Sequence, residues 1–163
     1  EHPVLVVETM ARSAGRSADQ FNHQAWAERV AAIGMAGHEH SDAAITDAMT
    51  IAAARAAEEL GVRALLCISA SGFTVRSMAR FRPSAKILGF SGQKATVRQL
   101  ASSWGVTPIF FEAGSADYEE RVRLAVNQAR REGHVATGDL IGVVAGIASV
   151  ARATDTFRMM RVP

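Results

Sequence analysis

The stretch "ALLCISASGFTVRSMARF", residues 64–81, decides the fold of this 163-residue chain. It opens with a short apolar run of the length of a buried strand and closes with a segment that has the spacing of a short helix. Between them lies "SASGFT", a turn of small and hydroxyl-bearing residues. A buried strand, a tight turn and a helix are the first half of a parallel-strand unit, so this stretch predicts an α/β fold.

The residues that follow repeat the same alternation. We expect strands at residues 86–90, 106–111, 139–146 and 155–162, with amphipathic helices at 93–104 and 117–133. Trp104, at the end of the first of these helices, is expected to pack in the core. No helix separates the last two strands, so the last one should return antiparallel. The pattern predicts a three-layer αβα domain with a five-stranded, mostly parallel sheet whose last strand is antiparallel.

Helical segments precede this domain. Residues 3–15 carry apolar residues at helical spacing behind Pro3, which suits the first turn of a helix. A weaker helix is expected over residues 17–33, followed by the linker "GMAGHEHSD" and an Ala-rich helix over 42–60 that ends at Gly61. We divide the chain into residues 1–15, 16–40 and 41–163. Because it begins with Glu1 and starts almost at once on a helix, we expect it to be a piece of a longer polypeptide.

Composition argues against several classes of protein. Lys and Arg number 18 against 16 Asp and Glu, and no block of basic residues stands out, which disfavours nucleic-acid binding. No apolar run of the given sequence has membrane-spanning length, and we expect no signal peptide. Its single cysteine, Cys67, lies in an apolar run and is expected to be a buried small hydrophobe. One cysteine allows no internal disulfide, which fits a reducing cytoplasm.

The turn "SASGFT" has two possible roles. Ligands of open parallel sheets lie beyond the carboxyl ends of the strands, which is where this turn is expected. The hydroxyls of Ser69, Ser71 and Thr74, the tight turn at Gly72 and the N–H groups of the next helix could cradle a phosphate. Alternatively, Ser71 or Thr74 only caps that helix. The patterns of a P-loop and of a dinucleotide fingerprint are both missing.

Other chemically active residues form no site on their own. His38, Glu39 and His40 could contact a metal, but they lack further ligands, and a solvated linker is the preferred interpretation. Arg121 is expected to pair with acidic neighbours on its own helix. The sequence does not bring together a nucleophile, a base and an orienting group, so the chain is not expected to be an enzyme by itself.

Several segments resemble the C-terminal domain of pyruvate kinase: "SGFTVRSMARFRPSAKILGF" (71–90), "VRQLASSWGVTP" (97–108), "GDLIGVVAG" (138–146) and "TDTFRMMRV" (154–162). "EHPVLVVETMAR" (1–12) is similar to the last helix of that family's catalytic barrel. The resemblance implies that the intact protein is a cytoplasmic phosphotransferase of glycolysis, which converts phosphoenolpyruvate and ADP to pyruvate and ATP with Mg²⁺ and usually K⁺.

The same resemblance implies that this chain has no catalytic residues. The family's catalytic groups lie in a barrel of about 250 residues, and they have no counterpart here, so the chain should be inactive alone. Its implied work is regulatory, as a subunit interface of a tetramer and as a site for a phosphorylated effector. A freestanding phospho-ligand-binding module of the same fold, not part of a kinase, remains the alternative.

The resemblance also implies which residues would contact the effector. They come from the "SASGFT" turn, from the helix that follows the third strand and from the closing loop "GIASVARATD" (146–155): Ser69, Ser71, Gly72, Phe73, Thr74, Arg121 and Arg152. Ala70 stands where a polar residue is common, and the closing loop lacks the family's usual glycines. These departures argue against fructose 1,6-bisphosphate and leave a simpler sugar phosphate or a nucleotide monophosphate.

Overall fold

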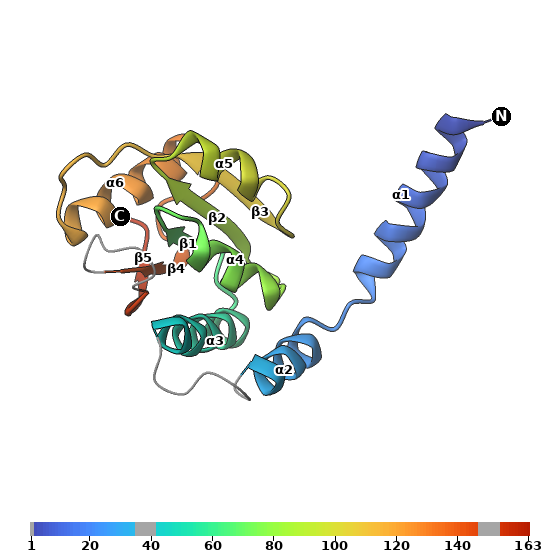
Figure 1. Ribbon diagram of the computed structural model, residues 1–163, viewed down its shortest axis with the longest axis horizontal. Coiled ribbons are helices and arrows are strands. Elements are labelled where there is room, and N and C mark those ends of the chain that lie inside the picture. Colours follow the sequence, from blue (N-terminus) through green and yellow to red (C-terminus); the bar gives the residue numbers. More distant parts are fainter. Residues whose placement is uncertain (1, 35–41, 147–153) are drawn as a thin grey trace.

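The computed structural model describes residues 2–34, 42–146 and 154–163. Five strands form one sheet in the order β3-β2-β1-β4-β5 (Figure 1). Their bounds are β1 (Ala64–Ile68), β2 (Lys86–Ser91), β3 (Val106–Phe110), β4 (Leu140–Ala145) and β5 (Thr156–Arg161). All neighbouring strands run parallel except β4 and β5, which are antiparallel. The predicted five-stranded sheet with an antiparallel last strand is confirmed.

The central strand, β1, is paired on both sides. Leu66 lies opposite Leu88 of β2 and opposite Val143 of β4. The first four residues of β1 are buried, which explains why its sequence is continuously apolar rather than alternating.

Helices cover both faces of the sheet. On one face, Leu65 and Cys67 of β1 belong to a core shared with α3 (Asp42–Leu60), α4 (Phe73–Arg80) and the end of α5 (Lys94–Leu100). On the other face, Leu66 packs in a core with α6 (Tyr118–Arg131). The chain therefore has the three layers expected from the sequence.

A glycine in β2 allows α4 to approach the sheet closely. A Cβ atom at Gly89 would lie 2.9 Å from Cγ1 of Val75 on α4 and 3.3 Å from Cγ1 of Val106 on β3. Both distances are shorter than ordinary contacts, so a side chain here would push α4 outward. The loop that precedes α4 is thereby held close to the end of the sheet.

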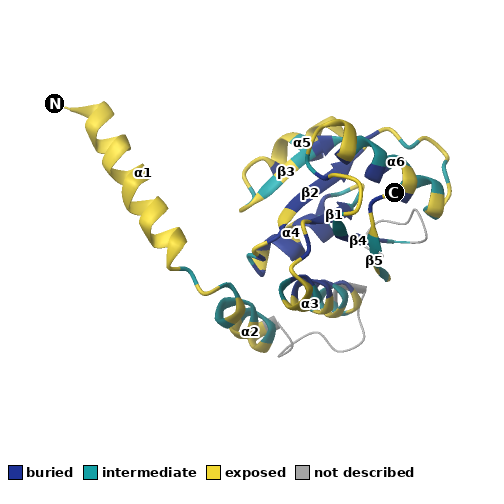
Figure 2. Cartoon of the chain, turned by 180° about the vertical axis from the view of Figure 1, so that it is seen from behind, coloured by how far each residue is buried: buried dark blue, intermediate teal, exposed yellow. Residues whose placement is uncertain are grey.

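Two helices precede the layered domain. The predicted helix at residues 3–15 continues to Asp19 as α1 (Pro3–Asp19), and the second helix begins only at His23, as α2 (His23–Gly34). Asn22 accounts for that start, because its Oδ1 accepts a hydrogen bond of 2.9 Å from the Ala25 N–H. None of the residues of α1 is buried, and the helix projects away from the rest of the chain (Figures 1 and 2). Of the described helices, none has the length and apolar character needed to cross a membrane.

The expectation for Trp104 is wrong. The helix predicted over residues 93–104 ends at Leu100, and the chain turns before Gly105, whose φ is 65°. Trp104 lies in that turn and is 42% exposed. Its ring contacts lie outside the core, 6.1 Å from the His23 ring and 5.6 Å from the Arg82 guanidinium.

Cys67 should be unreactive in the folded chain. Its side chain is completely buried in β1, and burial raises the pKa of the thiol from 9.0 to about 12. We expect reaction with Ellman's reagent at pH 8 to be slow and to accelerate with urea. We also expect the free energy of unfolding to fall between pH 9 and pH 12, because only the unfolded thiol ionises there. Rapid stoichiometric labelling in native buffer would contradict this burial.

Candidate functional site

The sheet order changes direction between β1 and β4, and the carboxyl ends of two such strands are where α/β proteins form a ligand-binding crevice. From β1 the chain passes through α4 to β2 on one side, whereas from β4 it passes to β5 on the other side. Loops that leave two adjacent strands in opposite directions open a space between them, and ligands of α/β proteins bind at such points. Around this space lie the "SASGFT" turn after β1 and Gly146 after β4.

Hydroxyl groups at the end of β2 and in the first turn of α5 anchor the "SASGFT" turn. The Ser69 N–H donates to Phe90 O of β2 at 3.0 Å. The carbonyl of Ala70 accepts hydrogen bonds from Ser91 Oγ at 2.9 Å and from Thr96 Oγ1 at 3.1 Å. Sequence reasoning missed Ser91 and Thr96. Their signal was available, because "SGQKAT" follows the next strand just as "SASGFT" follows the first.

Gly72 gives the turn its shape. It is the N-cap residue of α4, with φ 73° in the left-handed region. A Cβ atom there would lie 2.9 Å from Thr96 Cγ2 and 3.1 Å from Leu100 Cδ2. The turn is thus packed directly against α5. Glycine suits this position because it adopts a left-handed φ without strain and because there is no room for a side chain.

Side-chain capping of α4 is weak. The Ser71 hydroxyl accepts from the Phe73 N–H at 3.4 Å, which is long for a hydrogen bond. The Arg76 guanidinium donates to the Ser71 carbonyl at 3.2 Å, which fixes the backbone of the turn rather than its hydroxyl. Ser69 and Ser71 are half-buried. The start of α4 therefore retains its positive dipole end beside two serine hydroxyls, an arrangement that suits an anion.

The hydroxyl of Thr74 is used inside the protein. Thr74 Oγ1 and Thr154 Oγ1 are 2.6 Å apart, and both residues are buried, with 4% and 1% of their surface exposed. Thr154 lies just before β5. This pair ties the first turn of α4 to the chain segment that enters the last strand.

Arg121 ties α6 to the same region. It is half-buried on α6, and its Nη2 donates to the Gly146 carbonyl at 3.0 Å, directly after β4. Thr74 and Arg121 consequently hold the two ends of the segment between β4 and β5, one at Thr154 and the other at Gly146. Arg152 lies between those ends, outside the described residues, and His38, Glu39 and His40 lie outside them as well.

Tyr118 adds a buried hydroxyl near Arg121. Its Oη makes no hydrogen bond to any residue that the structure describes. Burial raises the pKa of the phenol, and the nearby Glu119 carboxylate raises it further. Glu119 is in turn paired with Arg158 of β5 at 2.9 Å. The phenol therefore stays protonated at neutral pH and is able to donate a hydrogen bond.

Metal ligands do not gather at this site. Within the described ranges, no group of three or more His, Cys, Asp or Glu side chains is placed to hold a metal ion. The Mg²⁺ that the family resemblance implies is expected in the catalytic barrel of the intact protein, outside this chain.

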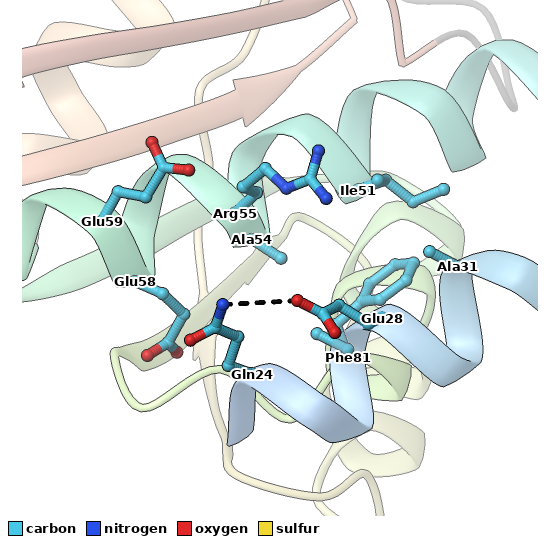
Figure 3. Close-up of a pocket in the computed structure, with 10 residues that line it drawn as sticks. Gln24, Glu28, Ala31, Ile51, Ala54, Arg55, Glu58, Glu59 and Phe81 are labelled. Atoms are coloured by element: carbon cyan, nitrogen blue, oxygen red, sulfur yellow. Dashed lines mark hydrogen bonds between the residues drawn. The ribbon is translucent and has the colours of Figure 1, made fainter. Parts of the chain in front are cut away.

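A separate hollow lies between α2 and α3 (Figure 3). It has a volume of about 220 Å³ and an apolar lining that includes Ile51 and Phe81. Glu28 and Glu59 line it, and among the described residues Arg55 is the only cation there. Glu58 also lines it, but its carboxylate already accepts from the N–H and hydroxyl of Ser84. This excess of negative charge disfavours a phosphate, so the crevice between β1 and β4 remains the candidate site.

Comparison with known proteins was made for the whole chain. A family model described as "Pyruvate kinase, alpha/beta domain" matches residues 47–160. The pyruvate kinase of Clostridium acetobutylicum is 30% identical over 163 residues, which cover 99% of this chain and 32% of that protein. The pyruvate kinase of Methylorubrum extorquens is 32% identical over 149 residues, covering 90% of this chain and 29% of that protein. The chain thus spans about a third of the length of these relatives.

Proposed function

The chain belongs to the pyruvate kinase family through its C-terminal α/β domain, and on that basis we propose that it regulates and assembles a pyruvate kinase. The proposal that this domain regulates the enzyme rests on one observation. Thr74 and Arg121 hold the two ends of the segment between β4 and β5, beside the turn that starts α4. A ligand bound at that turn would touch elements from both halves of the sheet.

A phosphorylated effector suits this crevice best. The start of α4, the hydroxyls of Ser69 and Ser71 and the guanidinium of Arg121 together offer positive charge and hydrogen-bond donors. Ala70, with its methyl side chain, is exposed within the turn and adds no charge. We therefore favour a single phosphate group, as in a sugar monophosphate or a nucleotide monophosphate. Phe73 and Arg152 belong to the same proposed contact set.

The catalytic reaction is proposed for the longer protein. The relatives are named pyruvate kinases, and this chain matches about a third of each. The conversion of phosphoenolpyruvate and ADP to pyruvate and ATP, with Mg²⁺ and K⁺, would then use residues outside this chain, which alone would be inactive. A tetrameric assembly and a cytoplasmic location belong to the same proposal.

The exposed face of α1 supports that assignment. Val4, Val7 and Met10 are 70%, 65% and 66% exposed, which is unusual for apolar residues spaced along one helix. In the division proposed above, residues 1–15 would pack into the catalytic barrel and residues 16–40 would link it to the α/β domain. A freestanding ligand-binding module would gain nothing from such a helix.

Replacing Ser71 with Asp should weaken effector binding at least about tenfold, because a carboxylate beside the phosphate adds like-charge repulsion. Isothermal titration calorimetry with glucose 6-phosphate, fructose 1,6-bisphosphate and AMP would measure this. Ser13→Asp, on the exposed α1, adds the same charge far from the site and should leave binding unchanged. Thr74 is less suitable for this test, because Asp would bury an unpaired charge there.

Two results would contradict the proposal. If Ser71→Asp binds as tightly as the parent chain, the effector does not lie at the "SASGFT" turn. If none of the three ligands binds the parent chain, this domain does not sense the phosphate compounds tested. Near-ultraviolet circular dichroism of each variant would show that the fold is retained.

A further inference from the structure

Arg82 has an unusual backbone conformation. It lies between α4 and β2, and its φ of 47° makes it the only non-glycine with positive φ in the described part of the chain. This conformation is unfavourable for a residue with a side chain, and such strain is often retained for a functional reason. Here the strain is held in place by α2, because His23 Nδ1 donates to Arg82 O at 2.5 Å and Trp26 Nε1 to Arg80 O at 2.8 Å.

Aromatic rings surround the Arg82 side chain. Its Cζ atom lies 4.8 Å from the centroid of the Trp26 ring, 5.5 Å from Phe21 and 5.6 Å from Trp104. We call these three rings and Arg82 the Arg82 cage. Two of the rings come from the segment at the start of α2 and the third from the turn after α5. Cation–π contacts of this kind hold a guanidinium in one position without using its N–H donors.

Those donors are unused within the described residues. The Arg82 side chain makes no hydrogen bond or ion pair there, although the residue is only half-buried. A guanidinium has five N–H groups in its plane, arranged to bind the two oxygens of a carboxylate or phosphate. Arg82 therefore presents a fixed charge with free hydrogen-bonding capacity.

A groove of about 450 Å³ opens beside the cage. Trp26, Arg76, Arg80, Arg82 and Trp104 are among the residues that line it. The Arg80 guanidinium is paired with the Asp47 carboxylate, and Arg76 contributes one donor to the Ser71 carbonyl. After the Asp47 pair is counted, two positive charges remain at the groove, which favours an anion.

We propose that this groove binds a small oxyanion, a phosphate ester or a carboxylate, through paired hydrogen bonds from Arg82. Arg76 supplies the additional positive charge. The site is separate from the crevice between β1 and β4, because it lies at the C-terminal end of α4 and the "SASGFT" turn lies at the N-terminal end. It does not depend on the effector site proposed above.

Tryptophan fluorescence offers a direct test. The sequence contains two tryptophans, and both belong to the Arg82 cage, so emission reports on this groove. The 163-residue chain would be titrated with inorganic phosphate and separately with succinate, with sodium chloride keeping the ionic strength constant. We expect a saturable change in emission. Arg82→Lys should raise the half-saturation concentration about tenfold, because an ammonium cannot form the paired hydrogen bonds.

The control variant is Arg98→Lys, which makes the same exchange at an exposed position of α5 and should titrate like the parent. Broadening of the phosphate signal in ³¹P NMR would measure binding without relying on the tryptophans. A response to phosphate alone would assign the groove to phosphate esters, and a response to succinate alone would assign it to carboxylates.

Three outcomes would overturn the proposal. The first is the absence of a saturable response to either anion. The second is an Arg82→Lys variant that binds as tightly as the parent chain. The third is a response that Ser71→Asp abolishes and Arg82→Lys leaves intact, because that anion would lie at the "SASGFT" turn. Comparing the Ser71→Asp and Arg82→Lys variants also shows which of the two proposals is wrong, the anion site in the groove or the effector site at the "SASGFT" turn.

Discussion

Replacement of Gly72 with Ala should lower the free energy of unfolding by about 3 kcal/mol, the sum of two effects. A left-handed backbone is unfavourable by about 1–2 kcal/mol for any residue with a Cβ atom. The added methyl would also lie 2.9 Å from Thr96 Cγ2, and overpacking of this kind destabilises by about 1–3 kcal/mol. Urea unfolding followed by circular dichroism would measure the change.

Gly133 provides a matched control for the backbone effect. Its φ is 75°, close to the 73° of Gly72, but a Cβ atom there would meet nothing within 4 Å. Gly133→Ala should therefore destabilise by about 1 kcal/mol, and the difference between the variants measures the packing of the "SASGFT" turn against α5. Equal losses in the two variants would show that the turn is not packed as described, and that the candidate site has a different shape.

Thr74→Val should destabilise the chain by about 2 kcal/mol, because it leaves the buried Thr154 hydroxyl without its partner. The two hydroxyls are 2.6 Å apart and belong to residues that are 80 positions apart in the sequence. Thr154→Val should have a similar effect. The double variant should be destabilised by less than the sum, since it leaves no unpaired hydroxyl, and we expect a coupling energy of about 1 kcal/mol.

Thr107→Val serves as the control for this cycle. Thr107 is exposed on β3, and replacing it with Val should change stability by less than about 0.5 kcal/mol. Strictly additive effects of Thr74→Val and Thr154→Val would show that the two hydroxyls do not act as a pair. The start of α4 would then be independent of the segment before β5, and the regulatory proposal would lose its structural basis.

Most of the fold could be predicted because each strand carries a local signal. Apolar runs such as "ALLCI" and "KILGF" have the length of a strand and are bounded by turn residues. The direction of the last strand also followed from the lack of a helix before it. Helix ends were less well predicted. The helix predicted over residues 93–104 ends at Leu100, and α1 continues through Gly15 to Asp19.

The candidate site could be predicted only in part, because its contacts join distant residues. The "SASGFT" turn follows a recognisable strand, so its place at the sheet edge was accessible from sequence. The Thr74–Thr154 pair and the Arg82–His23 hydrogen bond span 80 and 59 residues. Periodicity and turn chemistry describe only neighbours along the chain, so neither contact left a local signal. For the same reason the Arg82 cage was not predicted.

The strand order also determines at what stage of protein synthesis the crevice between β1 and β4 can form. A growing chain can pair β1, β2 and β3 in the order in which they leave the ribosome, but one edge of β1 stays open until β4 follows α6. Thr154 comes later still, so the crevice between β1 and β4 is complete only after the chain has been made as far as Thr154. A ligand that binds the folded form alone stabilises only that form. The effector proposed for this site would therefore distinguish chains that include β4 and Thr154 from chains that stop before them, and its concentration would influence how many newly made copies survive.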